Sequence, residues 1–257
     1  MTTFHSDPSV ASTRFSGYVD INRLRDTPCF IVGCGAIGRQ IALQLAAMGA
    51  RTLTLIDPDT VDELNIGTQG WGVQDLQMPK VTALGQEIST KFNFYPETEE
   101  YCWPPEVGDG EINDPKEFYQ DYPEVFKQGF HERYTPTIFF AVDSMDARQT
   151  IFEYVQNGTC NIIDTRMGLN ACRIISAGRS FGKDFSWYKK TLFSSSEAEQ
   201  APCTMKSTLY CANIAAGFAV SQFIESIRSD EGRADVDFLQ HNMLINIPNG
   251  LLIADEE

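Results

Sequence analysis

The chain has 257 residues, of which 42% are hydrophobic and 21% charged, and its formal net charge at pH 7 is -15. This length permits a large buried core, while the negative charge disfavours nucleic acid and anionic membranes as partners. No apolar run is long enough to cross a membrane and no signal-peptide core is visible, so we expect a cytoplasmic protein. Seven cysteines without a CxxC pair suit a reducing compartment and predict no structural zinc site.

A strand, a glycine turn, a helix and a second strand follow one another between Phe30 and Asp57. A short helix is expected before them at residues 19 to 25, closed by Pro28. The turn contains Gly33, Gly35 and Gly38. This spacing permits a sharp exit from the strand, close approach of backbone to a phosphate, and tight packing of the helix on the sheet. Asp57 is placed to accept hydrogen bonds from ribose hydroxyls, so the pattern predicts a bound nucleotide.

A loop with at most one helical turn is expected over residues 59 to 79, because glycines interrupt any regular pattern there. A helix is then expected over residues 80 to 92. Long loops at the carboxyl ends of parallel strands are where open α/β sheets bind ligands. Asn65, Gln69 and Lys80 are therefore candidates to contact the same nucleotide, with loop stabilisation or solvation as the alternative role of each.

Residues 93 to 137 form an acidic insertion rich in proline and aromatic residues. The aromatic content disfavours disorder, so we expect a packed, irregular cover with a short helix near residues 116 to 130. A surface that binds a partner is the alternative interpretation.

Regular elements return after the insertion. Strands are expected over residues 137–142, 161–163, 171–176 and 185–193, helices over residues 146–157 and 209–227, and a hairpin at Pro248-Asn249-Gly250. Asp143 stands at the carboxyl end of the first of these strands. Without an internal repeat or a clean linker, residues 1–257 are expected to form one domain. Its predicted class is α/β, Rossmann-like and doubly wound, with a mainly parallel sheet and an added antiparallel C-terminal part.

Several blocks together resemble one family. GCGAIG, LIDPDTVDELN, Gln69, the Pro79-Lys80 pair and AVDSMDAR at 141–148 resemble, in order and spacing, the ThiF/MoeB and ubiquitin-activating enzyme superfamily over about residues 14–227. Ordinary dehydrogenases lack the DxDxVxxxN loop and the lysine that follows it. The resemblance implies an enzyme that uses ATP and magnesium to adenylylate a carboxylate, usually the C-terminal glycine of a ubiquitin-like or sulfur-carrier protein.

The resemblance also implies the roles of individual residues. Gly33, Gly35 and Gly38 would form the nucleotide turn, Asp57 would bind the ribose, Asn65 and Lys80 would contact the phosphates, and Asp143 would help to hold the magnesium ion. Asp59, Gln69 and Arg148 complete the expected ATP-binding set. Arg14 resembles the arginine that homodimers of the family insert into the partner's site, so a homodimer is expected. Because adenylylation brings two anionic groups together, Lys80 is expected to matter most.

One position departs from the family pattern. An arginine normally precedes the loop glutamine, whereas Thr68 precedes Gln69 here. A threonine does not replace a guanidinium at a triphosphate. Either Arg39 or Arg148 supplies the missing charge, or ATP use is weakened.

Cys203 is the expected nucleophile. APCTMKS resembles the block in which ubiquitin-type activating enzymes carry their thioester cysteine, and the position before a helix favours a thiolate. An inert core cysteine is the alternative, and Cys34 and Cys211 are interpreted as packing residues.

Two other functions remain open from the sequence. An NAD-dependent oxidoreductase explains the glycines and Asp57 but gives no role to Asn65, Lys80 or the Cys203 block. A non-catalytic ThiF-like dimer partner or scaffold is consistent with Thr68.

Overall fold

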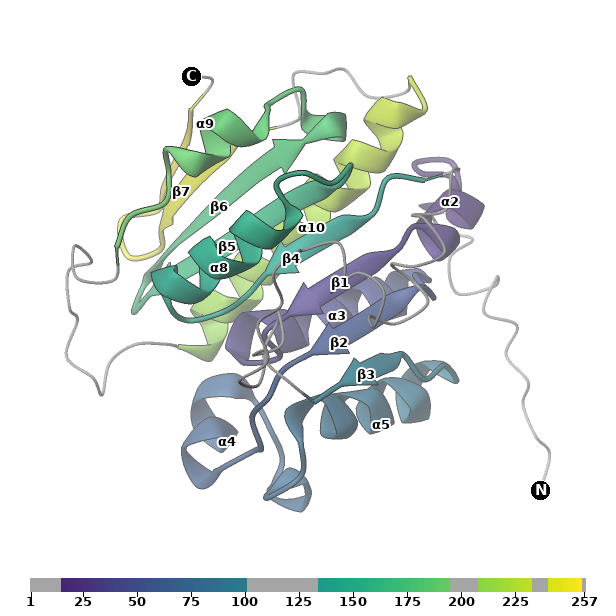
Figure 1. The fold of residues 1–257 in the computed structure, drawn as a ribbon. Coiled ribbons are helices and arrows are strands. Elements are labelled where there is room, and N and C mark those ends of the chain that lie inside the picture. Colours follow the sequence, from purple (N-terminus) through teal and green to yellow (C-terminus); the bar gives the residue numbers. More distant parts are fainter. Residues whose placement is uncertain (1–14, 101–133, 195–207, 233–239, 256–257) are drawn as a thin grey trace, which may run out of the picture.

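The structure, a computed structural model, describes residues 15–100, 134–194, 208–232 and 240–255. Arg14, Cys203 and most of the acidic insertion lie outside these residues, including the short helix expected near residues 116 to 130. The described chain forms one eight-stranded sheet with helices on both faces (Figure 1).

The sheet has the order β3-β2-β1-β4-β5-β6-β7-β8. Its strands are β1 (Cys29–Val32), β2 (Leu53–Ile56), β3 (Glu97–Glu99), β4 (Thr137–Phe140), β5 (Asn161–Gly168), β6 (Ala171–Gly178), β7 (Asn242–Asn246) and β8 (Leu251–Asp255). All pairs from β3 to β5 are parallel, and all pairs from β5 to β8 are antiparallel. The predicted Rossmann-like, mainly parallel sheet with an antiparallel C-terminal part is confirmed.

Helices cover the two faces unequally. They are α2 (Ile21–Asp26), α3 (Ala36–Met48), α4 (Glu63–Gln69), α5 (Lys80–Phe92), α8 (Met145–Val155), α9 (Phe185–Lys189) and α10 (Leu209–Asp230), with short 3-10 turns η2 (Val73–Asp75) and η3 (Arg179–Phe181). In Figure 1, α3, α5 and α10 lie behind the sheet, whereas α8 and α9 lie in front of it.

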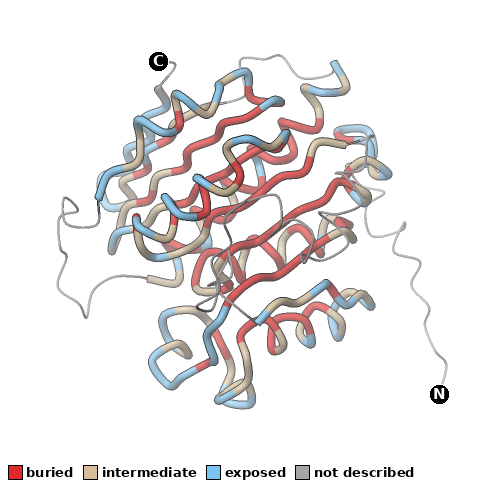
Figure 2. Tube along the Cα trace, viewed as in Figure 1, coloured by how far each residue is buried: buried red, intermediate tan, exposed pale blue. Residues whose placement is uncertain are grey.

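Two hydrophobic clusters follow from this layering. In β1, Cys29 and Ile31 belong to the larger cluster with α3, α5 and α10, and Phe30 and Val32 belong to the smaller one with α8 and α9. Successive side chains of a strand point to opposite faces, so a strand covered on both faces must be apolar throughout. Figure 2 shows the central strands buried along their length. This double coverage explains the uninterrupted apolar runs in the sequence.

The helix boundaries expected around the glycine turn and after the loop are confirmed. α3 ends against Gly49, whose φ of +109° gives the left-handed cap that glycine favours. α5 begins at Lys80 and ends at Phe92, and the hairpin at Gly250 joins β7 to β8.

The strand expected over residues 185–193 is wrong, because residues 185–189 form α9. The Asp184 carboxylate caps this helix by accepting the backbone N–H of Trp187 at 2.9 Å. Tyr188 is fully buried in the smaller cluster. Capping and packing therefore override the β-propensity of the aromatic residues.

Three other segments are more regular than expected. The loop over residues 59–79 contains α4 and η2, and α4 begins with a capping box between Asp62 and Asn65. The insertion contributes β3, which pairs in parallel with β2 at the edge of the sheet. β5 continues through Gly168 into a turn at residues 169–170.

Candidate functional site

The glycine turn between β1 and α3 has no room for a side chain at two of its three positions. Gly33 has a φ of +92°, and a Cβ atom there would lie 2.7 Å from the carbonyl oxygen of Ala141. A Cβ on Gly38 would lie 1.8 Å from the carbonyl oxygen of Gly33. The turn can therefore close against the segment after β4 only with glycine at these positions.

The start of α3 has the geometry of an anion site. Gly35 is its N-cap and makes no side-chain hydrogen bond to the helix. Backbone amides at the first turn of a helix point outward, and the helix dipole adds positive potential there. A phosphate at this end would meet both.

Asp57 follows β2 and connects the turn to the next loop. Its Oδ2 accepts the backbone N–H of Cys34 at 2.6 Å, and its Oδ1 accepts that of Asp59 at 2.8 Å. Burial raises the pKa of Asp57 above its usual value and outweighs the Lys80 charge and the backbone donors, which lower it. A carboxylate has about four lone-pair positions, so capacity remains for a hydroxyl donor.

Lys80 brings a buried cation to the same place. Its Nζ lies 2.7 Å from Oδ2 of Asp59 and 3.9 Å from Oδ1 of Asp57. The Lys80 side chain is only 7% exposed, whereas that of Asp59 is 64% exposed. Within the described residues the ammonium makes one hydrogen bond, to Asp59. Two of its three N–H donors are therefore available to a ligand.

α4 carries Asn65 and Gln69. The side chain of Asn65 accepts the N–H of Asp62 at 3.2 Å, so it stabilises the start of the helix. Gln69, at the other end, reaches the turn: its Oε1 lies 3.7 Å from where a Cβ on Gly35 would stand. The structure thus brings Gln69 to the glycines and uses the Asn65 side chain in a cap.

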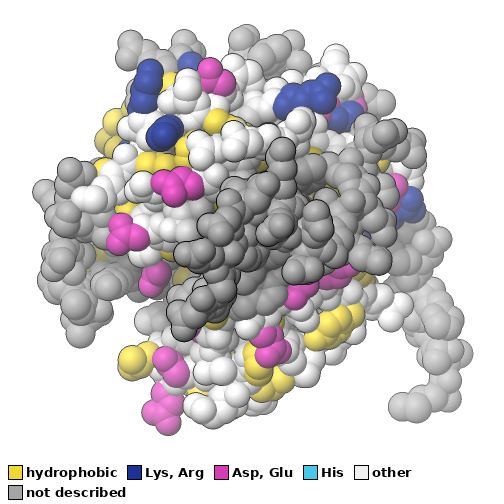
Figure 3. All heavy atoms as spheres, in the orientation of Figure 1, with side chains coloured by type: hydrophobic (Ala, Val, Ile, Leu, Met, Phe, Trp, Pro, Cys, Tyr) yellow, Lys and Arg dark blue, Asp and Glu magenta, His cyan; other side chains and the backbone are white. Residues whose placement is uncertain are grey.

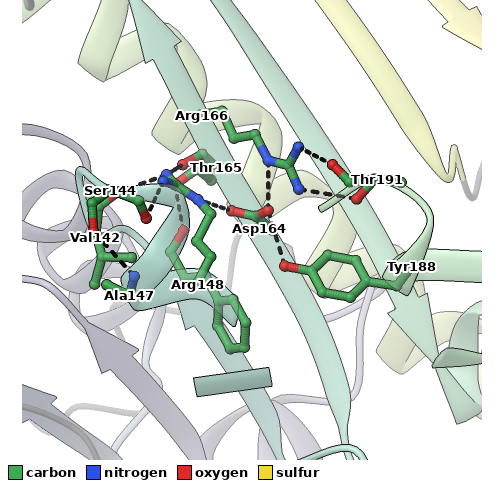
Figure 4. Close-up of polar contacts among 10 residues, drawn as sticks. Val142, Ser144, Ala147, Arg148, Asp164, Thr165, Arg166, Tyr188 and Thr191 are labelled. Atoms are coloured by element: carbon green, nitrogen blue, oxygen red, sulfur yellow. Dashed lines mark hydrogen bonds and ion pairs between the residues drawn. The ribbon is translucent and has the colours of Figure 1, made fainter. Parts of the chain in front are cut away.

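Asp143 is exposed two residues after Ala141, and Arg148 holds the backbone on both sides of it (Figure 4). Arg148 Nη2 donates to the carbonyl oxygen of Val142 at 2.6 Å, and Nη1 donates to that of Ser144 at 3.0 Å. The same guanidinium pairs through Nε with a buried carboxylate of β5. Arg148 therefore supports the segment that carries Asp143.

Arg39, on α3, lies beside the end of α4. Its Nη2 pairs with Glu87 at 2.6 Å, and its guanidinium stacks over the Trp71 ring at 5.1 Å. Its Nη1 lies 3.3 Å from where a Cβ on Gly70 would stand. Thr68 is exposed, and its hydroxyl donates to a carbonyl of its own helix. Of the two arginines considered as substitutes at this position, Arg39 is the one near the loop.

Two residues near the site were missed by the sequence interpretation. Asp164, fully buried on β5, pairs with Arg148, and its signal was a charged residue inside an apolar strand. Trp71, 3% exposed, lies beside Gln69, and its signal was a single large aromatic side chain among glycines. Neither matched a motif that the sequence interpretation used.

Arg14 and Cys203 lie outside the described residues. Cys34 and Cys211 are buried, as expected of packing residues, and burial holds the pKa of the Cys34 thiol well above its usual value.

Among the described residues, no three metal-binding side chains cluster together. In the same part of the chain no helix is long and apolar enough to cross a membrane. On the face seen in Figure 3, the described Lys and Arg side chains lie in the upper part, and most of the described Asp and Glu side chains lie in the middle and lower parts.

Comparisons with known proteins place this chain in a family. The sequence profile of the ThiF family matches residues 7–250. A search of curated proteins found no match.

Among solved structures, the chain is similar to PaaA, with 20% identity and a TM-score of 0.61 over 92% of this chain and 74% of that one. It is also similar to E. coli MccB, solved with MccA-N7isoASN (15% identity, TM-score 0.65) and with ATP (15%, 0.64). Both alignments cover 91% of this chain and 65% of MccB, so the chain spans less than two thirds of that protein. These likenesses show the fold. Because the family profile covers nearly the whole sequence, the chain belongs to the ThiF family.

Proposed function

We propose that this protein is an ATP-dependent adenylyltransferase, which joins a substrate carboxylate to the α-phosphate of ATP and releases pyrophosphate. The observation that carries the proposal is the buried Lys80 ammonium, held beside the glycine turn through Asp57 and Asp59. In the dinucleotide fingerprint, backbone amides at the helix N-terminus bind the pyrophosphate, and no further cation is needed. A reaction between a carboxylate and a triphosphate does need one, because two anions must meet.

Lys80 acts by charge and position. Two opposite unit charges about 4 Å apart attract each other by about 4 kcal/mol at an effective dielectric of 20, so the ammonium can stabilise a developing negative charge by about this amount. Asp59 is largely exposed, so its pairing with Lys80 is screened by water and can be exchanged for a phosphate. We infer that the ammonium turns from Asp59 to the nucleotide when ATP binds.

The other residues predicted to bind ATP would contact the same nucleotide. The first turn of α3 would receive phosphate, Asp57 would accept a ribose hydroxyl, and Gln69 would donate to a phosphate. Asn65 and Arg148 would act mainly by holding α4 and the Asp143 segment in place, because their side chains bond within the protein.

Magnesium would bind through Asp143. This ion usually takes one or two protein carboxylates and completes its shell with water and substrate phosphates. Asp143 fits that pattern, since it is exposed on a segment that closes against the glycine turn. When bound, the ion would neutralise phosphate charge.

The substrate class is the finer part of the proposal. We propose that the carboxylate is the C-terminal glycine of a ubiquitin-like or sulfur-carrier protein. Cys203 would then attack the acyl-adenylate, forming a thioester and releasing AMP, and Arg14 would act across a homodimer. The family membership and the Cys203 block support this. MccB has been solved with MccA and, separately, with ATP.

The test is pyrophosphate exchange with candidate partners that end in Gly-Gly. Lys80→Ala should lower exchange by about 100- to 1,000-fold, the range for removing one group that stabilises a transition-state charge. Lys189→Ala, which removes an exposed lysine from α9, is the matched control and should leave exchange unchanged. Exchange that survives Lys80→Ala would overturn the role of Lys80, and a thioester that survives Cys203→Ala would overturn that of Cys203.

A thermal-shift assay separates the other candidates. A ligand that binds only the folded state raises the melting temperature, so ATP with magnesium should do so and NAD should not. Stabilisation by NAD alone would favour an oxidoreductase. The second candidate function is a non-catalytic scaffold, which Thr68 favours. A melting temperature that neither ATP nor NAD raises would support the scaffold.

A further inference from the structure

The amide of Gln69 is held between the glycine turn and Trp71. On one side it faces Gly35, where its Oε1 and Nε2 would lie 3.7 and 3.8 Å from a Cβ atom. On the other side, Trp71 Nε1 donates a hydrogen bond to Gln69 Oε1 at 3.0 Å. Two backbone elements, the end of α4 and the start of α3, thus meet at one side-chain amide.

The bond from Trp71 determines which way the amide points. An indole N–H only donates, so the atom that it meets must be the carbonyl oxygen of Gln69. The oxygen is therefore occupied, and the NH2 group, which lies at nearly the same distance from Gly35 as the oxygen, keeps its two donors. Donors are what a phosphate oxygen requires, whereas an amide flipped by 180° would present a repelling oxygen.

Trp71 is itself fixed. Its side chain is 3% exposed, and the Arg39 guanidinium stacks over the ring at 5.1 Å. Arg39 is anchored in turn on Glu87 of α5 at 2.6 Å. The orientation of the Gln69 amide therefore depends on contacts among three helices, α3, α4 and α5.

We propose that Trp71 is a positioning residue for nucleotide binding: it orients Gln69 so that the amide donates to a phosphate at the glycine turn, and Arg39 holds the indole in place. The proposal rests on the proposed function, because it requires a nucleotide at the turn. It assigns Arg39 an indirect role in compensating for Thr68, since that arginine acts through Trp71 and Gln69.

The experiment is a double-mutant cycle on nucleotide affinity, measured by calorimetry. Trp71→Phe removes the indole donor and keeps a ring for Arg39, and Gln69→Leu removes the amide at similar volume. Each should weaken ATP binding about fivefold to tenfold, the usual worth of one hydrogen bond. The double variant should bind ATP no more weakly than Gln69→Leu alone, because Trp71 acts through Gln69. Adenosine, which has no phosphate, should bind all variants equally, and Trp187→Phe on α9 is the matched control.

Additive losses, or equal losses for ATP and adenosine, would overturn the proposal and leave only a packing role for Trp71. A second measurement does not depend on the fold of Trp71→Phe. The chain has three tryptophans, so a variant with Trp103→Phe and Trp187→Phe reports on Trp71 alone. ATP should change its emission, and unchanged emission at saturating ATP would contradict the proposal. A wild-type protein that binds no ATP would overturn the proposed function as well.

Discussion

Two buried ion-pair clusters, one around Asp164 and one around Lys80, use the same chemistry and differ in how completely they are satisfied. The Asp164 carboxylate is fully buried and accepts hydrogen bonds from Arg148 at 2.8 Å, Arg166 at 2.7 Å and the Tyr188 hydroxyl at 3.0 Å. Arg166 donates hydrogen bonds from its other two nitrogens to the carbonyl oxygen and the hydroxyl of Thr191 (Figure 4).

The Lys80 cluster is incomplete by comparison. Lys80 is buried but makes one hydrogen bond within the described residues, and its partner Asp59 is 64% exposed. A buried charge without a full set of partners is costly, and such charges concentrate where a ligand completes the set. The comparison teaches that the two clusters differ in the saturation of their donors more than in burial or charge: every donor nitrogen around Asp164 has an acceptor, whereas Lys80 has donors left over in the described part of the chain.

The largest expected effect follows from breaking the saturated cluster. Asp164→Ala should lower the free energy of unfolding by about 3–5 kcal/mol, because two arginines would keep buried charges without a counter-ion. Lys80→Ala should lower it by about 1 kcal/mol or less, as expected when the partner is exposed. Denaturant titration of both variants measures the difference. Equal losses would refute the distinction between the clusters.

The dependence of stability on pH should have opposite signs at the two clusters. Burial alone would raise the pKa of Asp164, but the charges and hydrogen bonds of Arg148 and Arg166 prevail and hold it below its usual value. Its contribution is therefore complete above the unfolded pKa of about 3.9 and is lost as pH falls through the folded pKa. Asp57 has a raised pKa, so its contribution is present below about 3.9 and is lost as pH rises through the folded value.

Measuring the free energy of unfolding of wild type, Asp164→Asn and Asp57→Asn across pH 2 to 8 tests these signs. For one titrating group, this free energy can change by at most about 1.4 kcal/mol per pH unit. The advantage of wild type over Asp164→Asn should grow as pH rises through the acid range. Its advantage over Asp57→Asn should shrink as pH rises. Parallel profiles would contradict the assigned pKa directions.

The smallest effect should come from restoring the arginine that the family carries at the loop. Thr68→Arg adds a cation to the exposed end of α4 and should tighten ATP binding about fivefold, corresponding to about 1 kcal/mol for an exposed ion pair. Thr68→Gln adds length without charge and serves as the control. An affinity that stays the same would mean that Lys80 and Gln69 already satisfy the phosphates.

The candidate site was predictable where local geometry forces a residue type. Gly33 has a φ of +92° and Gly38 packs against the carbonyl oxygen of Gly33, so the spacing of these glycines marked the turn. The role of Arg148 was less accessible, because its bonds to Asp164 and Thr165 join α8 to β5 across a separation that no local pattern spans. The helix α9 was likewise not predictable from local sequence, because it forms where the Tyr188 hydroxyl donates to the buried Asp164 of β5.

By itself, the sequence determined the mainly parallel class of the sheet, the glycine turn, the start of α5 at Lys80 and the family, because each depends on patterns within short stretches of the chain. Only the tertiary structure decided which charges are saturated and which way the Gln69 amide points. Those properties arise from side chains far apart in sequence, such as Arg39 with Glu87 and Arg148 with Asp164. No local pattern encodes such pairs, because the sheet and its helices must first bring them together.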